Sequence, residues 1–332
     1  MKNILIISDA ATPQVNGVVR TIETTIRVLE ENGWRVKLVH PGMFRTIPTP
    51  GYPEIRMVVS TKGLAKEMID FDPDFIHIAT EGRLGWAARK LCRQWGWRFT
   101  TAYHTDFPGY LRKHYGVPAR LTYAVMRRFH SASSAVMVST PTVERQLREQ
   151  GFENLVRWGR GVDTSQFVPR IDPYEDNDEP VLLNVGRVSK EKNLEAFFAL
   201  DVPGLKIVVG DGPMLETYRE QYPEVVFTGK MTGKPLAAIY AMADVFVFPS
   251  VTDTFGLVII EALAAGTPVA AYPVQGPIDI LCGDSGRLAT GGDLSGAVRE
   301  ALKLDREGVA RVGQEFTWER ATAQFVSALV AR

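Results

Sequence analysis

Short apolar runs alternate with amphipathic segments of helical length along most of the chain. The runs are rich in β-branched residues and suit strands buried on both faces of a parallel sheet, with helices packed over them. In the first half the expected strands are Ile4–Ile7, Val36–Val39, Phe75–Ile78, Phe99–Tyr103, Ala135–Val138 and Leu155–Arg157. The expected helices there are Val18–Glu31, Leu84–Gln94, Arg120–His130 and Pro141–Glu149.

The same alternation restarts in the second half. The expected strands are Val181–Val185, Leu205–Val209, Val225–Thr228, Val245–Phe248 and Val269–Ala270. The expected helices are Leu194–Leu200, Met214–Tyr222, Lys234–Met242, Leu257–Ala265 and Leu294–Leu302. The pattern predicts an α/β protein with two doubly wound, parallel-sheet (Rossmann-like) domains that face a central cleft, where ligands bind beyond the carboxyl ends of the strands.

A polar, acidic and proline-flanked segment over residues 169–180 separates the two halves and is the predicted linker. A chain of 332 residues fits two domains of about 150 residues each. We therefore expect an N-terminal domain over residues 1–168 and a C-terminal domain over residues 181–316.

The composition, with 45% apolar and 23% charged residues, is that of a globular protein. Basic and acidic residues number 38 each, which argues against a nucleic-acid partner. The chain has no signal-peptide pattern at its start and no apolar run of spanning length, so we expect a cytoplasmic protein. Cys92 and Cys282 are expected to be buried thiols in a reducing compartment.

Asp253 and Glu261 flank the start of the predicted helix Leu257–Ala265. Eight residues span roughly two helical turns, so both carboxylates would point to one side, beside the free N–H groups of the first turn. That combination suits a ligand with hydroxyl groups and an anion. A capped core helix with Asp253 as N-cap is the alternative, and this segment alone leaves both open.

Three loops that follow predicted strands carry further signals. The loop at Asn16-Gly17 has a single glycine and no G-x-G-x-x-G, which argues against a nicotinamide or flavin enzyme. The loop Gly186–Asn193 places cations at the positive end of a helix, an unfavourable position that an anion such as a diphosphate would relieve. The third loop, Gly210–Pro213, predicts a tight turn at the same edge.

His104 follows a predicted strand directly, which places it at the edge where ligands bind. The other four histidines, His40, His77, His114 and His130, are expected to be structural. The Asp72-Pro73-Asp74 segment is similar to a D-x-D metal motif but precedes a strand, so we predict a turn at the opposite edge.

Residues 110–130 interleave cations with aromatic and aliphatic side chains. A basic amphipathic helix of this kind is typical of a segment that lies on an anionic bilayer, such as the inner face of the cytoplasmic membrane. An ordinary surface helix is the alternative.

Together these motifs resemble the family 4 retaining glycosyltransferases of the GT-B architecture. The resemblance is carried, in chain order, by Asn16-Gly17, His104, Trp158–Asp163, Gly186-Arg187 with Lys192, Gly210–Pro213, and Asp253 with Glu261–Val269. The segment around residues 103–131 and the Thr252–Gly256 phrase look most like bacterial diacylglycerol-type glycolipid synthases. The resemblance also implies that a final helix starting near Trp318 crosses back to the first domain, so residues 317–332 are set apart.

The resemblance implies roles for single residues. Arg187 and Lys192 would bind the donor diphosphate, and Asp253 would bind hydroxyls of the donor sugar, with His104 against that sugar; these four are the candidate catalytic residues. The full candidate set for the nucleotide sugar is Asn16, Gly17, Gly186, Arg187, Lys192, Gly210, Asp211, Gly212, Phe255, Gly256, Leu257 and Glu261, with Glu261 on the ribose. The family's usual first acid is Glu, so the shorter Asp253 puts the donor's identity in doubt.

The implied reaction is retaining transfer of a hexose or hexuronate from a nucleoside diphosphate sugar, UDP-linked by preference, to a lipid such as diacylglycerol, with an α-linkage. No metal and no resident cofactor are expected. One alternative is a GDP-mannose-dependent α-mannosyltransferase acting on a glycan or lipid-linked saccharide. Another alternative is a catalytically silent nucleotide-sugar-binding protein. A further one is a GT-B epimerase, which typically needs extra acidic and histidine residues around the cleft, and His104 with Asp106 are the only candidates for these in the sequence.

Overall fold

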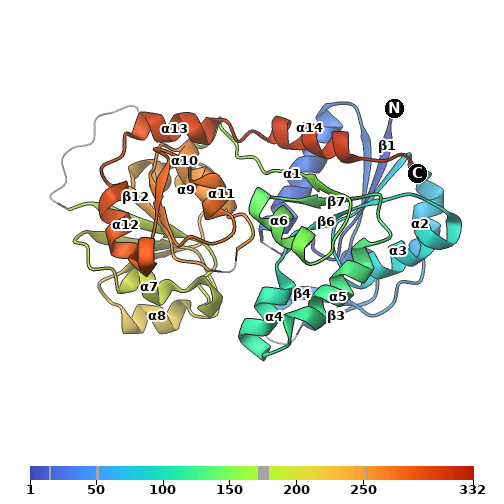
Figure 1. The fold of residues 1–332 in the computed structure, drawn as a ribbon, viewed down its shortest axis with the longest axis horizontal. Coiled ribbons are helices and arrows are strands. Elements are labelled where there is room, and N and C mark those ends of the chain that lie inside the picture. Colours follow the sequence, from blue (N-terminus) through green and yellow to red (C-terminus); the bar gives the residue numbers. More distant parts are fainter. Residues whose placement is uncertain (15, 50–51, 171–178, 252) are drawn as a thin grey trace. The chain divides into compact units, whose positions relative to one another are not determined.

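The computed structural model describes residues 1–14, 16–49, 52–170, 179–251 and 253–332. Its contacts group the chain into two compact units, Met1–Arg160 with Trp318–Arg332, and Gly161–Thr317. Figure 1 shows the ribbon of both units, with colours that follow the sequence from the N-terminus (blue) to the C-terminus (red). Most of the predicted linker, residues 171–178, lies outside the described residues.

Residues 161–168 belong to the second unit, although the sequence boundary was expected after residue 168. The Val162 N–H donates to the Phe316 carbonyl at 2.8 Å, and the Phe167 ring packs edge-on against Tyr240 at 5.7 Å. These contacts tie the segment to the second core before the linker begins.

The first unit is built on a six-stranded parallel sheet in the order β2-β1-β5-β6-β7-β8. The strands are β1 Asn3–Ile7, β2 Arg35–Val39, β5 Phe75–Ile78, β6 Thr100–Tyr103, β7 Ala135–Val138 and β8 Leu155–Arg157. The helices of this unit are α1 Gly17–Glu31, α2 Leu64–Phe71, α3 Arg83–Trp95, α4 Phe107–Tyr115, α5 Ala119–His130, α6 Pro141–Glu149 and α14 Trp318–Ala328. A short η1 turn (Pro41–Met43) and an antiparallel pair, β3 Thr46–Thr49 with β4 Tyr52–Val58, complete it.

The second unit repeats the plan with the order β11-β10-β9-β12-β13-β14, again all parallel. Its strands are β9 Val181–Val185, β10 Leu205–Val209, β11 Val226–Gly229, β12 Val245–Phe248, β13 Val269–Ala271 and β14 Gly286–Leu288. Its helices are α7 Leu194–Phe198, α8 Leu215–Gln221, α9 Gly233–Met242, α10 Leu257–Ala264, α11 Pro277–Ile280, α12 Leu294–Ala301 and α13 Arg306–Gln314, with the 3-10 turns η2 Lys190–Lys192 and η3 Thr290–Gly292. Two doubly wound parallel sheets confirm the predicted fold class.

The expected strands of both sheets all form, because runs such as Ile4–Ile7 are buried on both faces. The elements that the pattern did not predict are each nine residues long or shorter. They are the β3–β4 pair, β14, α2, α4, α11 and α13. The D-x-D segment forms a turn, as predicted: Asp72 ends α2 with φ 47°, and the Asp74 carboxylate accepts from the Asn3 N–H at 2.7 Å.

The expected helix Arg120–His130 forms as α5, whereas the longer basic segment over residues 110–130 is not one helix. These residues are divided between α4 and α5, because Gly116 ends α4 in the left-handed region (φ 66°) and Pro118 is the N-cap of α5. A second correction concerns Cys282, which is exposed, whereas Cys92 is buried as predicted. None of the helices among the described residues has the length and apolar character needed to cross a membrane.

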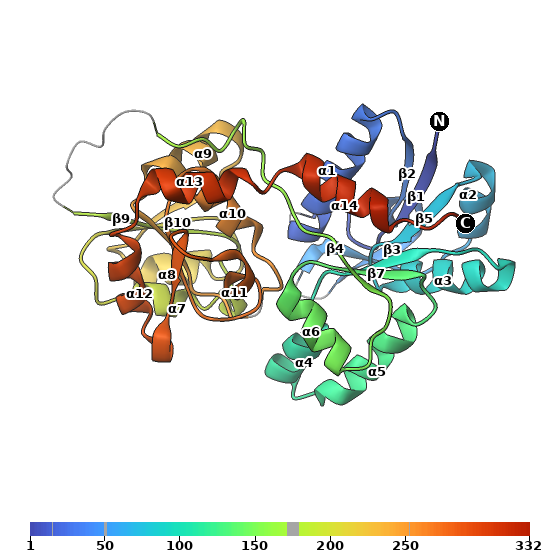
Figure 2. The same ribbon diagram turned by 45° about the horizontal axis from the view of Figure 1, so that its top comes forward.

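The last helix, α14, completes the core of the first unit. Phe325 is fully buried there with Ile4, Ile6 and Trp158, and its ring lies 4.9 Å from that of Trp158. The Gln324 side chain accepts from the Gly159 N–H at 2.8 Å. Figure 2 shows α14 alongside α1, the helix with which it packs.

Replacement of Phe325 by alanine should lower the free energy of unfolding by about 3–5 kcal/mol, because it leaves a cavity under the first sheet. Chemical denaturation followed by circular dichroism measures this. Ser327→Ala, an exposed change on the same helix, should stay within about 0.5 kcal/mol of the parent. Equal effects of the two substitutions would show that α14 does not contribute to the core in this way.

Candidate functional site

In the second unit, the loops after β9 and β10 are bonded to each other through their backbones. The Gly186 N–H donates to the Val209 carbonyl at 3.0 Å, and the Val188 N–H donates to the Asp211 carbonyl at 2.9 Å. The two predicted motif loops therefore form one rigid layer at the carboxyl edge of the sheet.

Glycine is required at Gly210 because of this close approach. Gly210 has φ 153°, and a Cβ atom there would stand 1.8 Å from the Gly186 carbonyl oxygen. A Cβ atom at Gly212 would likewise stand 2.3 Å from the Val188 carbonyl oxygen. The glycines predicted as a tight turn thus let one loop backbone lie directly on the next.

Lys192 and Asp253 form an ion pair that joins the loop after β9 to the loop after β12. The Lys192 Nζ donates to both carboxylate oxygens of Asp253, at 2.7 and 2.8 Å. The Asn193 side chain, on a residue with φ 56°, also donates to the Pro249 carbonyl at 3.0 Å. About a quarter of each charged side chain of the pair stays exposed, 28% and 25%, so a ligand can reach both.

Burial by itself would raise the pKa of Asp253, but the charge and hydrogen bonds of Lys192 outweigh it and hold that pKa below its usual value. The carboxylate therefore stays ionised at neutral pH. An ionised carboxylate accepts hydrogen bonds and does not donate them, which suits the hydroxyl groups of a ligand.

Asp253 is not the N-cap of the helix that follows, so the capped-core alternative is wrong. The N-cap of α10 is Gly256, with φ 89° and no side-chain cap. A Cβ atom at Gly256 would stand 2.9 Å from the Ile259 side chain, and Phe255 beside it is buried. The first turn of α10, starting at Leu257, therefore begins from a tightly packed glycine turn.

Glu261 lies inside α10 with 2% exposure, and its Oε2 accepts from the Tyr240 hydroxyl at 3.0 Å. The sequence placed Glu261 and Asp253 on one side of a helix; the structure instead puts Asp253 in the preceding loop, paired with Lys192, and Glu261 in the buried face. Arg187, in the loop after β9, is half-buried.

In the first unit, the candidate residues also follow strands at the carboxyl edge. The Asn16 side chain caps α1 by accepting from the Val18 and Val19 N–H groups, both at 3.0 Å, and Gly17 is the first helical residue. His104 follows β6 and is 8% exposed. The sequence analysis did not single out its partner: Arg160, after β8, lies with Nη2 3.0 Å from His104 Nδ1.

Burial lowers the pKa of His104 well below its ordinary value, and the positive charge of Arg160 adds to that effect, with smaller contributions from His77 and His130. The ring is therefore neutral at neutral pH. Burial lowers the pKa of His77 as well, to about 3, in keeping with the structural role predicted for it.

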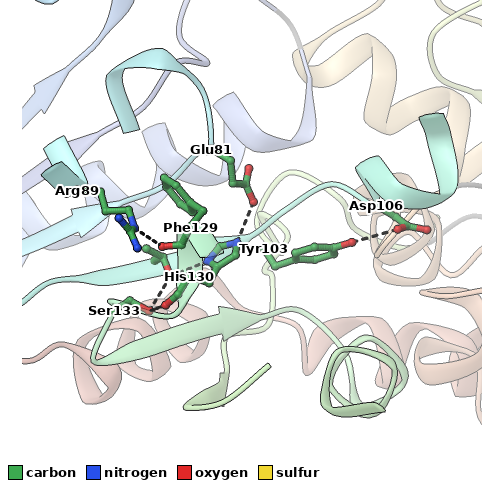
Figure 3. A network of polar contacts seen from close by, with 8 residues as sticks. Glu81, Arg89, Tyr103, Asp106, Phe129, His130 and Ser133 are labelled. Carbon is green, nitrogen blue, oxygen red and sulfur yellow. Dashed lines mark hydrogen bonds and ion pairs between the residues drawn. The ribbon is translucent and has the colours of Figure 1, made fainter. Parts of the chain in front are cut away.

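A buried polar network lies beside β6 (Figure 3). The His130 ring contacts the Glu81 carboxylate at 3.2 Å and the Thr101 hydroxyl at 2.9 Å, on opposite nitrogens. The Tyr103 hydroxyl donates to Asp106 at 3.0 Å, and Asp106 caps α4. This network fixes the loop that carries His104, and sequence reasoning missed Glu81 because no motif marks it.

In the part of the chain that the structure describes, no three His, Cys, Asp or Glu side chains are grouped so that they could hold a metal ion. The expectation of metal-independent chemistry remains a prediction.

We expect Gly210→Ala to destabilise the second unit and to abolish ligand binding at this edge, since the added methyl collides with the backbone of Gly186. Gly233→Ala is the matched control, because Gly233 also has positive φ (64°) but open space around its Cα. Thermal unfolding and nucleotide titration of both variants measure the difference. If the two variants behave alike, backbone strain and not close approach explains the glycine.

Comparison with known proteins supports the assignment of both units. The sequence model described as Glycosyltransferase Family 4 matches residues 15–166, and that described as Glycosyl transferases group 1 matches residues 179–304. A GDP-mannose-dependent alpha-mannosyltransferase of Mycobacterium tuberculosis is 30% identical over 84% of this chain and 81% of that protein. The alpha-monoglucosyldiacylglycerol synthase of Streptococcus pneumoniae is 27% identical over 89% and 77%.

Among solved structures, sucrose-phosphate synthase of Thermosynechococcus elongatus is similar with a TM-score of 0.81 and 21% identity, over 98% of each chain. Anabaena HepE, in complex with UDP-glucose, has a TM-score of 0.73 and 14% identity, over 99% of this chain and 100% of that one. These likenesses concern the fold. Together with the matched family models and the 30% identical relative, they show that the chain belongs to glycosyltransferase family 4 and has the paired Rossmann-like domains of the GT-B fold.

Proposed function

We propose that the protein transfers a sugar from a nucleoside diphosphate sugar to a lipid-containing acceptor, with retention of configuration and without a metal ion. The observation that carries this proposal is the Lys192–Asp253 ion pair at the carboxyl edge of the second sheet. The pair places a cation, which can bind a diphosphate, beside an ionised carboxylate, which can accept hydrogen bonds from sugar hydroxyls. A nucleoside diphosphate sugar carries both a diphosphate and sugar hydroxyls.

In this proposal Lys192 and Arg187 bind the diphosphate, and a sugar hydroxyl takes the place of Lys192 on Asp253. The N–H groups at the start of α10 add donors for the phosphate or sugar. Glu261, oriented by Tyr240, accepts from the ribose. The family resemblance assigns Asn16, Gly17 and His104 to the same ligand, and the proposal keeps that assignment.

The reaction follows from these charges. The bond between the sugar C1 and the phosphate oxygen breaks, and its electron pair goes to the leaving diphosphate. The cations of Arg187 and Lys192 stabilise that charge, the task that a metal ion performs in other enzymes. The acceptor oxygen bonds to C1 on the same face, and its proton passes to the departing phosphate oxygen, so the configuration is retained.

GDP-mannose is the proposed donor. The support is the printed name of relatives of this chain, the mycobacterial proteins at 30% and 28% identity and a Corynebacterium glutamicum protein at 27%, all GDP-mannose-dependent alpha-mannosyltransferases. Each covers 84% of this chain. A UDP-sugar, the donor expected from the sequence, is the second candidate.

The lipid part of the acceptor is proposed from α4 and α5. Four apolar side chains there are 40–69% exposed, namely Phe107, Tyr115, Leu121 and Val125. Arg127 and Arg128 lie in the last turn of α5. Exposed apolar groups beside cations suit an anionic lipid surface. Relatives with diacylglycerol or phosphatidylinositol in their names point the same way.

A thermal-shift comparison tests the donor. GDP should raise the melting temperature of the protein more than UDP or ADP, because a ligand that binds only the folded state stabilises it, by about 2.7 kcal/mol at a hundredfold excess over Kd. Lys192→Met should lose most of this shift, and Asp253→Asn should lower mannosyl transfer about 100-fold. Lys190→Met is the matched control, since Lys190 is exposed on the same turn. A larger shift with UDP would contradict GDP-mannose as the donor and favour a UDP-sugar. Unchanged transfer by Asp253→Asn would refute the proposed site.

Liposome flotation tests the lipid surface. The double variant Leu121→Ser and Val125→Ser should bind anionic vesicles at least several-fold more weakly than the parent and transfer sugar to vesicle-embedded diacylglycerol-type acceptors more slowly. Ile69→Ser, at an equally exposed apolar position on α2 (55%), should change neither. Equal binding by all three proteins would contradict the assignment of α5 to this surface.

A further inference from the structure

Arg160 is an unusual buried cation in the first unit. Its side chain is almost fully buried, at 8% exposure of the residue. Its Nη1 donates to the Trp158 and Gly159 carbonyls at 2.7 and 2.8 Å, and its Nη2 lies 3.0 Å from His104 Nδ1. The guanidinium also stacks over the Trp158 ring, 4.7 Å from its centre. Burial lowers the pKa of Arg160 to about 9, so it is still charged at neutral pH.

The contact with His104 determines which ring nitrogen carries the proton. A guanidinium has only hydrogen-bond donors, so His104 Nδ1 has to accept. In a neutral imidazole the proton then sits on Nε2, which becomes a donor. Protonation of Nδ1 would set two N–H groups against each other and would place a second positive charge beside the first.

The groups around His104 act in the same direction. The titratable side chains that influence it come from three elements: Arg160 after β8, His77 on β5 and His130 on α5. Each of these disfavours a cationic His104. Two acids of the same unit have other partners: Glu81 contacts His130, and Asp106 accepts from Tyr103.

We propose that Arg160 is a positioning residue for sugar transfer: it holds His104 as the neutral Nε2–H tautomer, so that the ring donates a hydrogen bond to a hydroxyl of the donor sugar and does not act as a base. This rests on the proposed function, in which His104 faces the donor sugar. The proposed chain of contacts runs from the Trp158 and Gly159 carbonyls through the guanidinium and the imidazole to the substrate.

Nitrogen-15 NMR of labelled histidine tests the tautomer without any substrate. In the parent protein at pH 7, His104 should show an unprotonated Nδ1 and a protonated Nε2, with His104→Gln used to assign the signals. Arg160→Met should lose this fixed state, and Arg160→Lys should retain it in part because its long, donor-only side chain comes nearest to the reach of the guanidinium. A proton on Nδ1, or a doubly protonated ring, in the parent would overturn the proposal.

The pH dependence of kcat/KM with the donor identified by thermal shift tests the catalytic consequence. The lowered pKa of His104 keeps the ring neutral well below pH 6.5, so the parent should show no loss from this group between pH 8 and 6. Without Arg160 nothing selects the tautomer, so at pH 7 part of the Arg160→Met population carries the proton on Nδ1 and the variant should be slower than the parent. Loss of the Arg160 charge also raises the pKa of His104 part of the way toward its ordinary value, although burial, the larger cause of the lowered pKa, remains. Acidification then protonates both nitrogens and restores the Nε2–H donor, so the variant's activity should recover relative to the parent as the pH falls. Equal kcat/KM in parent and variant at every pH would refute the positioning role.

Arg89→Met is the matched control for loss of a buried arginine. Arg89 is 7% exposed and donates to the Phe129 and Arg128 carbonyls at 2.7 and 2.6 Å. It should lose stability yet keep the parent's pH profile and His104 tautomer. If Arg160→Met does not fold, the parent and Arg160→Lys spectra still decide the tautomer. If His104 has the expected tautomer but the protein turns over no donor, the proposed function and the role of Arg160 in sugar transfer are both refuted. The assignment of the tautomer to the Arg160–His104 contact then still holds.

Discussion

The central place of β9 in the second sheet is the constraint on which the candidate site depends. Strand β9 pairs with β10 on one side and β12 on the other, all parallel, so the loops that follow these three strands emerge at one edge. The cation of Lys192 comes from one of these loops and the carboxylate of Asp253 from another, 61 residues later. A crossover connection brings them within a hydrogen bond of each other, and no local sequence preference could do so.

Charge is handled differently in the two units. In the second unit, opposite charges meet at a partly exposed edge, where a ligand can compete for either partner. In the first unit, a buried arginine is satisfied by backbone carbonyls and an imidazole, and the arrangement keeps the neighbouring histidine neutral. The Lys192–Asp253 pair can open so that each charge binds a ligand instead. The Arg160–His104 contact keeps one imidazole nitrogen as a hydrogen-bond donor.

Much of this fold could be predicted from the sequence, because runs such as Val245–Phe248 are apolar throughout and therefore have to be buried on both faces. Lys192 was found because a cation at the start of a helix is unfavourably placed, and Gly210 was found because Gly210–Pro213 has the composition of a tight turn. Arg160 as the partner of His104 could not be found, since the two are 56 positions apart and meet only through strand order. The break at Gly116 was visible as a residue type, yet the run of cations and aromatic side chains on both sides suggested one helix. The exposure of Cys282 depends on how the loop after α11 packs, which the apolar pattern around it does not encode.

The return of α14 to the first unit has a consequence for biosynthesis. The chain leaves the ribosome from its N-terminus, so Met1–Arg160 is made long before Phe325, which fills the core between Trp158 and Ile6. The second unit, continuous from Gly161 to Thr317, is fully synthesised before the last part of the first unit, Trp318–Arg332. The N-terminal unit, although translated first, therefore reaches its final packing last, and until then its sheet presents an apolar surface to chaperones.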